Sequence, residues 1–221
     1  MASQVSHIVY AKKYFERLES GELFSSLEKK GIGVAPLGKI NKDEFMLGAT
    51  FPDIRRIDEN IKRKDTHMKF DLIDLDFSGL SSFEAGWKFH LYCDMKREEI
   101  LNKYNFYSLP GTTDFANFSP KMLEDEMVYD DYNNWEKIRN FFNNPPYIET
   151  SSEVSRETFR LWYAILAKYI EKNPDTKSMR VLIIKWPSMS DKIDDIMASI
   201  EKLRENKKAV EILKKVKDEI V

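Results

Sequence analysis

Residues 81–104 read SSFEAGWKFHLYCDMKREEILNKY, and this stretch decides the fold. Ser81 and Glu84 match a capping box, which predicts a helix that begins here and continues to about Tyr104. A helix that is apolar all round is enclosed by other elements, so we expect a long central helix within a multi-helix bundle. Its first half has apolar side chains in nearly every direction: Phe83, Trp87, Phe89, Leu91, Tyr92 and Cys93.

The chain before this helix is also expected to contain helices. A helix over residues 6–20 places four side chains on one face, those of His7, Ala11, Tyr14 and Leu18. Shorter helices are predicted over residues 23–30 and 41–47, the second ended by Gly48. Residues 49–80 are predicted to form an irregular loop with room for one helical turn, and a loop of this length is often functional.

Further helices are predicted after an aromatic loop over residues 105–118. Ser119 as N-cap and Pro120 at the first helical position predict a helix that reaches about residue 142. Another is expected over residues 153–172. The apolar run 179–186 fits either a strand or a buried helical turn.

The C-terminal residues 188–221 are predicted to be helical, with a break near Asn206. Their apolar side chains fall roughly along one side. We therefore expect the stretch to pack on the rest of the domain. Partner binding is the alternative, including a homo-oligomer formed through this stretch, because helices rich in Lys and Glu can form coiled coils.

Composition supports one all-α domain over residues 1–221. The chain has 42% hydrophobic and 33% charged residues, with eight glycines and eight prolines. Scarce glycine and proline, together with Lys and Glu at helical spacing, favour helices over a sandwich or barrel. The formal net charge of −2 argues against a dedicated nucleic-acid binder, which usually carries a strong basic excess.

The chain carries no recognisable export or membrane signal. The first twenty residues lack the apolar core of a signal peptide, and no apolar run is long enough to cross a bilayer. Cys93 is the single cysteine, so no internal disulfide can form. The predicted location is the cytoplasm.

A His and an Asp within the apolar central helix point to a metal site. His90 and Asp94 are four residues apart, so their side chains lie on one face. A buried carboxylate is costly unless it is paired or binds a metal. The simpler interpretation is that His90 and Asp94 pair with each other. Asp53 and His67 lie in the irregular stretch just before this helix. The four together form a ligand set that suits zinc, and also manganese, iron or nickel.

The order and spacing of these residues resemble the zinc-dependent phospholipase C family, which includes related nucleases of the same all-helical fold. The family pattern is an early histidine, an aspartate after proline, a histidine about fourteen residues later, and His-x-x-x-Asp on a long helix. This chain has His7, Pro52-Asp53, His67 and His90-x-x-x-Asp94. The match covers roughly residues 5–100.

The resemblance implies a specific arrangement of metal ions. Asp53, His67, His90 and Asp94 would bind one ion, and Asp94 would bridge to a second ion held by His7. No histidine follows His90 in the sequence, so the family's third metal site is not expected. One or two zinc ions are therefore the predicted cofactor.

The implied activity is metal-dependent hydrolysis of a phosphate ester or phosphodiester. Asp53 would orient or deprotonate the attacking water. Arg55, Arg56 and Lys64 follow Asp53 and would hold the phosphate of the substrate, unless this basic run is simply a solvated loop. The competing hypothesis is a non-catalytic helical protein that keeps a structural or vestigial metal site and acts through protein contacts.

Overall fold

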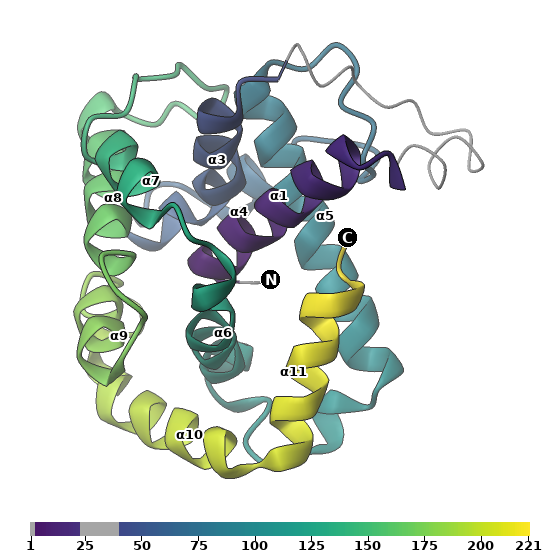
Figure 1. Cartoon of the computed structure of the whole chain (residues 1–221). Helices are drawn as coiled ribbons and strands as arrows, with labels where there is room; N and C mark the ends of the chain where they lie inside the picture. The colour runs from purple at the N-terminus through teal and green to yellow at the C-terminus, as the bar shows by residue number, and fades with distance from the viewer. Residues whose placement is uncertain (1–2, 23–39) are drawn as a thin grey trace.

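The computed structural model describes residues 3–22 and 40–221. Within these ranges the regular structure consists of ten α-helices and short 3-10 segments, with no strand (Figure 1). The all-α, single-domain fold predicted from the sequence is therefore confirmed. The helix predicted over residues 23–30 lies outside the described residues. No helix in the described ranges is long and apolar enough to span a membrane.

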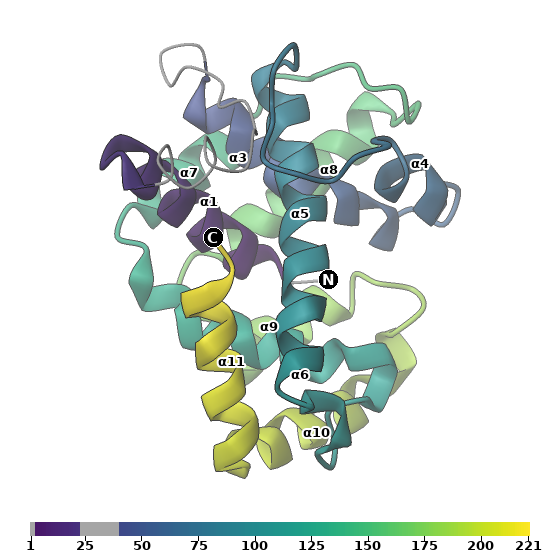
Figure 2. The same cartoon turned by 90° about the vertical axis from the view of Figure 1, so that its right-hand side faces the viewer.

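The long helix at the middle of the fold is α5 (Ser82–Lys103), and α1, α3 and α11 pack against it (Figure 2). The predicted capping box is present: Ser81 Oγ accepts a hydrogen bond from the Glu84 amide at 3.2 Å. In return, Glu84 Oε2 accepts one from the Ser81 amide, also at 3.2 Å. Trp87 and Phe89 are completely buried, as expected for a helix enclosed on several sides.

Two glycines bring α3 (Lys42–Thr50) into backbone contact with α5. A Cβ atom on Gly48 would lie 1.9 Å from the Phe83 carbonyl oxygen, and one on Gly86 would lie 2.0 Å from that of Phe45. The prediction that Gly48 ends its helix is wrong, because this glycine lies inside α3. It is needed there for the close crossing of the two helices, which no larger residue allows.

The stretch expected to be irregular contains two short helical segments. They are η2 (Phe51–Arg56), a 3-10 helix, and α4 (Arg63–His67). Trp87 of α5 anchors both, since its ring packs against Phe51 at a centroid distance of 4.7 Å and its Nε1 donates to the Thr66 carbonyl at 2.6 Å. Residues 68–81 contain no further helix.

The helix predicted to begin at Ser119 begins earlier and ends earlier. It is α6 (Asp114–Val128), so Pro120 lies inside the helix. Its first turns are distorted by positive φ angles at Phe115 (51°) and Asn117 (64°), and no residue beyond Asn117 in this helix has a positive φ. Regular helical geometry therefore begins close to the predicted start, although the hydrogen-bonded helix already begins at Asp114.

The predicted continuation of this helix to residue 142 is wrong, because the chain turns after Val128. A 3-10 segment, η4 (Tyr129–Asp131), separates α6 from α7 (Trp135–Asn143). The rings of Tyr129 and Trp135 stack at 4.5 Å, and Trp135 Nε1 donates to the Tyr129 carbonyl at 3.0 Å. The Asp and Asn residues between the helices compete for backbone hydrogen bonds, which favours a turn.

The regular structure after α7 is again helical. It comprises α8 (Arg156–Tyr169), α9 (Thr176–Ile183), η5 (Ser190–Lys192), α10 (Ile193–Glu205) and α11 (Lys207–Glu219). The run 179–186, which fitted either a strand or a helical turn, begins within α9. The break predicted near Asn206 is present, and the Asn206 side chain caps α11 by accepting from the Ala209 amide at 3.1 Å.

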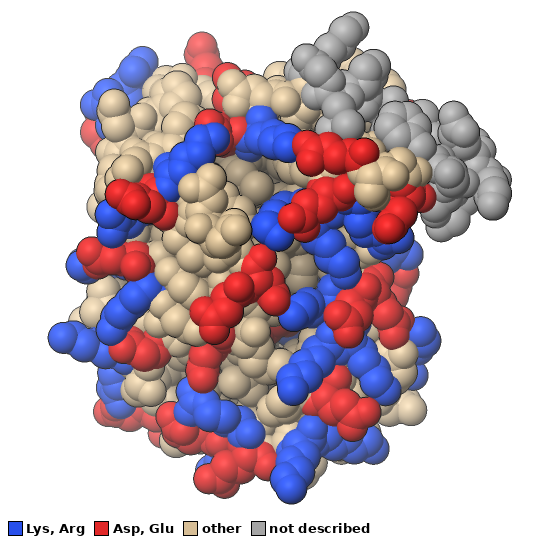
Figure 3. All heavy atoms as spheres, in the orientation of Figure 1, with Lys and Arg blue, Asp and Glu red and all other residues tan. Residues whose placement is uncertain are grey.

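The last two helices pack on the bundle rather than extending from it. Helix α10 lies against α6, and α11 lies against α5 and α6 (Figure 1). Their apolar side chains are buried, as at Ile200 and Leu213. On the face shown in Figure 3, basic and acidic side chains alternate and do not gather into a patch of one sign.

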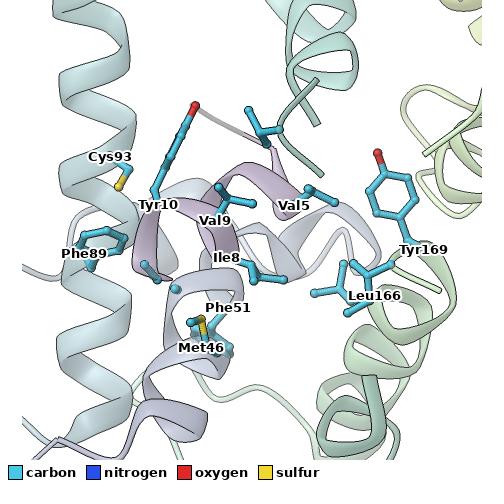
Figure 4. Close-up of a cluster of buried hydrophobic side chains, with 14 of the residues drawn as sticks. Val5, Ile8, Val9, Tyr10, Met46, Phe51, Phe89, Cys93, Leu166 and Tyr169 are labelled. Carbon is cyan, nitrogen blue, oxygen red and sulfur yellow. The ribbon is translucent and has the colours of Figure 1, made fainter. Parts of the chain in front are cut away.

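Helix α1 (Gln4–Glu19) lies in the interior of the bundle. Val5, Ile8 and Val9 are buried in an apolar cluster to which Phe89 and Cys93 of α5 and Leu166 and Tyr169 of α8 also contribute (Figure 4). The first half of α1, residues 4–11, is buried on all sides, so polar side chains in this half lie in the core. His7, between these apolar residues, is therefore completely buried.

Candidate metal centre

All five predicted ligands converge in the structure from four different segments. His7 comes from α1, Asp53 from η2, His67 from the end of α4, and His90 and Asp94 from α5. They form two groups of three, His7 with His90 and Asp94, and Asp53 with His67 and His90. Within each group the candidate ligand atoms lie within 4.8 Å of one another.

The carboxylate of Asp94 lies at the middle of the three imidazoles. Its Oδ1 is 3.5 Å from His7 Nε2, and its Oδ2 is 3.5 Å from His90 Nε2 and 3.9 Å from His67 Nε2. These distances exceed the normal hydrogen-bond range. Two ligand atoms on a tetrahedral zinc, with bonds of about 2.0–2.1 Å, lie about 3.3–3.4 Å apart. The two 3.5 Å spacings are therefore close to the edges of a coordination tetrahedron, and the 3.9 Å spacing is somewhat longer.

The two oxygens of Asp94 face different histidines, so this carboxylate suits a bridging role. His90 does not suit a bridging role. Its Nδ1 lies 2.8 Å from the Ala49 carbonyl oxygen, so only Nε2 remains for a metal. One nitrogen lone pair binds one ion. The shared ligand between two ions would therefore be Asp94, as the resemblance implies.

The three histidine rings are held in fixed orientations. The rings of His7 and His90 stack with centroids 3.8 Å apart and 17° between their planes. The ring of His67 stands edge-on to that of His90 at 5.6 Å, and its Nδ1 lies 2.9 Å from Thr66 Oγ1. The Nε2 atoms of all three are buried without a hydrogen-bond partner among the described residues. Buried polar atoms are rarely left unsatisfied, and a metal ion would satisfy all three.

Asp53 is positioned by two neighbours. Its Oδ1 accepts a hydrogen bond from Arg56 Nε at 2.9 Å, and its Oδ2 accepts one from Gln4 Nε2 at 2.7 Å. Each carboxylate oxygen keeps a further lone pair for a metal. The sequence interpretation missed Gln4, although its position three residues before His7 places both side chains on one face of α1.

Four of the candidate ligands, His67, His90, Asp53 and Asp94, are in their metal-binding protonation states at neutral pH. Burial lowers the pKa of His67 to about 4 and that of His90 to about 3, so both rings are neutral. Burial alone would raise the pKa of Asp53, but the Arg56 guanidinium holds it well below its usual range. Burial likewise opposes ionisation of Asp94, but the groups around it hold its pKa well below its usual range. Neutral imidazoles and carboxylates bind metals without first losing protons.

A groove of about 380 Å³ leads from the surface to one side of the centre. His67 and Asp94 form part of its wall, with Arg63 beside them. His7 and His90 are completely buried behind them. A small ligand would therefore reach the centre from the side of His67 and Asp94.

The three basic residues predicted to hold a phosphate occupy different surroundings. Arg56 bonds Asp53, and its guanidinium lies 4.6 Å from the centroid of the Trp186 ring. Arg55 also faces Asp53, with Nη2 4.0 Å from Oδ1. Lys64 is exposed on α4. Arg63, from the same basic run, is the residue that lines the groove.

Comparison of this chain with family models, with curated proteins and with solved structures gave no match. The likeness to zinc-dependent phospholipase C therefore consists of the residue pattern and its spacing.

Proposed function

We propose that this protein is a metal-dependent hydrolase of phosphate esters or phosphodiesters, with one or two divalent ions between α1, η2, α4 and α5. The proposal depends on one observation above all. Three buried, unbonded Nε2 atoms surround a single carboxylate at 3.5–3.9 Å. A mixed set of imidazole and carboxylate ligands suits zinc best, and also accepts manganese, iron or nickel.

The distances favour a division of the ligands between two ions. Asp53, His67 and His90 with Asp94 Oδ2 would hold the first ion, and His7 with Asp94 Oδ1 the second. The first set supplies four protein ligands. The second supplies two from the described residues, which leaves coordination positions for water or a substrate oxygen.

Divalent ions in such a centre supply Lewis acidity toward a phosphoryl group and toward water. The residues of the chain determine where that chemistry takes place. Asp53 has a low pKa, so at neutral pH it is a weak base and suits a role as ligand and orienting group better than proton abstraction. Arg63 in the groove wall brings a positive charge to the side from which an anionic substrate approaches.

Turnover of chromogenic phosphate mono- and diesters by the zinc-, manganese- or nickel-loaded protein tests the proposal. We expect slow hydrolysis that Asp53→Asn and His7→Ala each reduce by at least about 100-fold. Cys93→Ala is the matched control, because Cys93 is buried on the same helix but is not a ligand. A fully metal-loaded protein without any turnover would instead support the structural, partner-binding alternative.

A further inference from the structure

Arg97 is a buried cation whose bonding capacity is only partly used. It lies three residues after Asp94 on α5 and is completely buried. Its Nε donates to Glu124 Oε2 of α6 at 2.6 Å. Neither of its Nη atoms has a hydrogen-bond partner among the described residues. A guanidinium normally uses its planar fork of donors, so two buried Nη atoms without acceptors suggest that a ligand is missing.

Lys121 of α6 is a second such cation, with only 5% of its surface exposed. It shares one face of α6 with Glu124 and Asp125. That face is turned toward the other helices of the centre, since Glu124 bonds Arg97 of α5 and Asp125 accepts from the Ser6 amide of α1 at 2.8 Å. Within the described residues Lys121 has neither an ion pair nor a hydrogen bond.

The charges around Lys121 belong to the metal centre and to Arg97. Burial and the positive charges of Arg56 and Arg97 lower the pKa of Lys121 to about 8, while Asp94 and Asp53 oppose that change. Lys121 lies one turn of α6 before Glu124, the partner of Arg97, so the two cations share one region. Of the two, Arg97 alone has a carboxylate within ion-pair distance among the described residues. A buried charge without a counter-charge is costly, so this arrangement favours binding of an anion.

We propose that Lys121 and the Nη atoms of Arg97 form a binding subsite for a phosphate oxyanion beside the metal centre. The Arg97 fork can donate two parallel hydrogen bonds to a tetrahedral oxyanion, and Lys121 adds a point charge. The identity of the anion as a phosphoryl group rests on the proposed hydrolase function. Binding itself requires no hydrolysis, so the two proposals can be separated.

Lys121→Met is the variant that tests the subsite, because it keeps the length of the side chain and removes a buried charge. Arg97 is less suitable, since its loss would also leave Glu124 buried and unpaired. In phosphate-free buffer we expect Lys121→Met to melt at a higher temperature than the wild type. Lys202→Met is the control, because Lys202 is exposed on α10.

Calorimetric titration of the zinc-loaded proteins with inorganic phosphate gives the decisive measurement. We expect Lys121→Met to bind phosphate at least about tenfold more weakly than the wild type at equal zinc content. Phosphate should raise the melting temperature of the wild type and of Lys202→Met, and raise it much less in Lys121→Met. Lys121→Arg should recover most of the affinity.

Wild-type affinity for phosphate in Lys121→Met, or no phosphate binding by the wild type, would overturn the subsite. If Lys121→Met does not fold, Lys121→Gln takes its place with the same expected results. Loss of phosphate binding in the variant together with no ester hydrolysis by the wild type would support the subsite and sink the hydrolase proposal. Ester hydrolysis by the wild type together with unchanged phosphate affinity in Lys121→Met would support the hydrolase proposal and overturn the subsite.

Discussion

The imidazole ring of His7 stacks on that of His90, with centroids 3.8 Å apart, although the two residues lie far apart in the chain. The stack exists because α1 is buried against the central helix α5. It directs the Nε2 atoms of both rings toward the two oxygens of Asp94. A centre assembled in this way depends on the packing of whole helices, and four measurable consequences follow from its geometry.

Removal of metal should destabilise the fold. The candidate ligands come from four segments, so ions bound only by the folded chain would link η2 and α4 to α5, and α1 to α5. At free zinc about 100 times its Kd the stabilisation is about 2.7 kcal/mol, which corresponds to roughly 5–10 °C in Tm for a chain of this size. Chelation followed by thermal melting measures this stabilisation. We expect His90→Ala to melt at the same temperature with and without zinc, and the control Cys93→Ala to be stabilised by zinc like the wild type. An unchanged Tm after chelation and after zinc addition would exclude a metal centre here.

The metal-free protein should lose stability as the pH falls from about 6.5 to 4. Burial lowers the folded-state pKa of His67 to about 4, below the value of about 6.5 expected in the unfolded chain. The unfolded state therefore takes up a proton first, and stability declines through this window. For His67 alone the loss is on the order of 3 kcal/mol, and His90 acts in the same direction. Denaturant unfolding of the chelated protein at a series of pH values measures the decline. Constant stability between pH 6.5 and 4 would contradict burial of neutral imidazoles.

Enlarging either glycine at the crossing of α3 and α5 should damage both the fold and the centre. Gly48→Ala would place a methyl group 1.9 Å from the Phe83 carbonyl oxygen, so the helices would have to separate. We expect a loss of about 3 kcal/mol in the free energy of unfolding. Zinc affinity should fall as well, because α3 supplies the Ala49 carbonyl that orients His90. Chemical denaturation and zinc titration measure the two effects. Lys42→Ala, an exposed change on the same helix, should alter stability by no more than about 0.5 kcal/mol.

Loss of the Gln4 side chain should weaken metal binding without removing a ligand. Gln4→Met leaves Asp53 Oδ2 without its donor, so the carboxylate is no longer held in one orientation. Substitution of such supporting residues typically reduces metal affinity by about 10- to 100-fold. Competition with a chromogenic chelator measures the affinity, and Lys12→Met, a change on the outer side of α1, is the control. Equal zinc affinity in Gln4→Met and the wild type would show that Arg56 alone positions Asp53.

Local sequence features were sufficient to predict the helical class, the limits of α5 and the candidate ligands that the structure brings together. Capping and periodicity are local properties, so the start of α5 at Ser82 after its Ser81 cap and the break at Asn206 could be read from neighbouring residues. The ligands could be named because His and Asp are costly inside an apolar helix face, and the spacing of Asp53, His67 and His90 matches a known pattern.

Only the tertiary structure decided which residues surround those ligands. Gly48 has the sequence signature of a helix end, yet it lies inside a helix because the backbone of α5 passes within contact of it. Gln4, Arg97 and Lys121 look like ordinary polar residues on helices. Their surroundings arise from burial by other helices, which bring an acceptor to Gln4 but, among the described residues, none to Lys121. Burial of a side chain depends on contacts between segments far apart in the chain, and no local periodicity encodes those contacts.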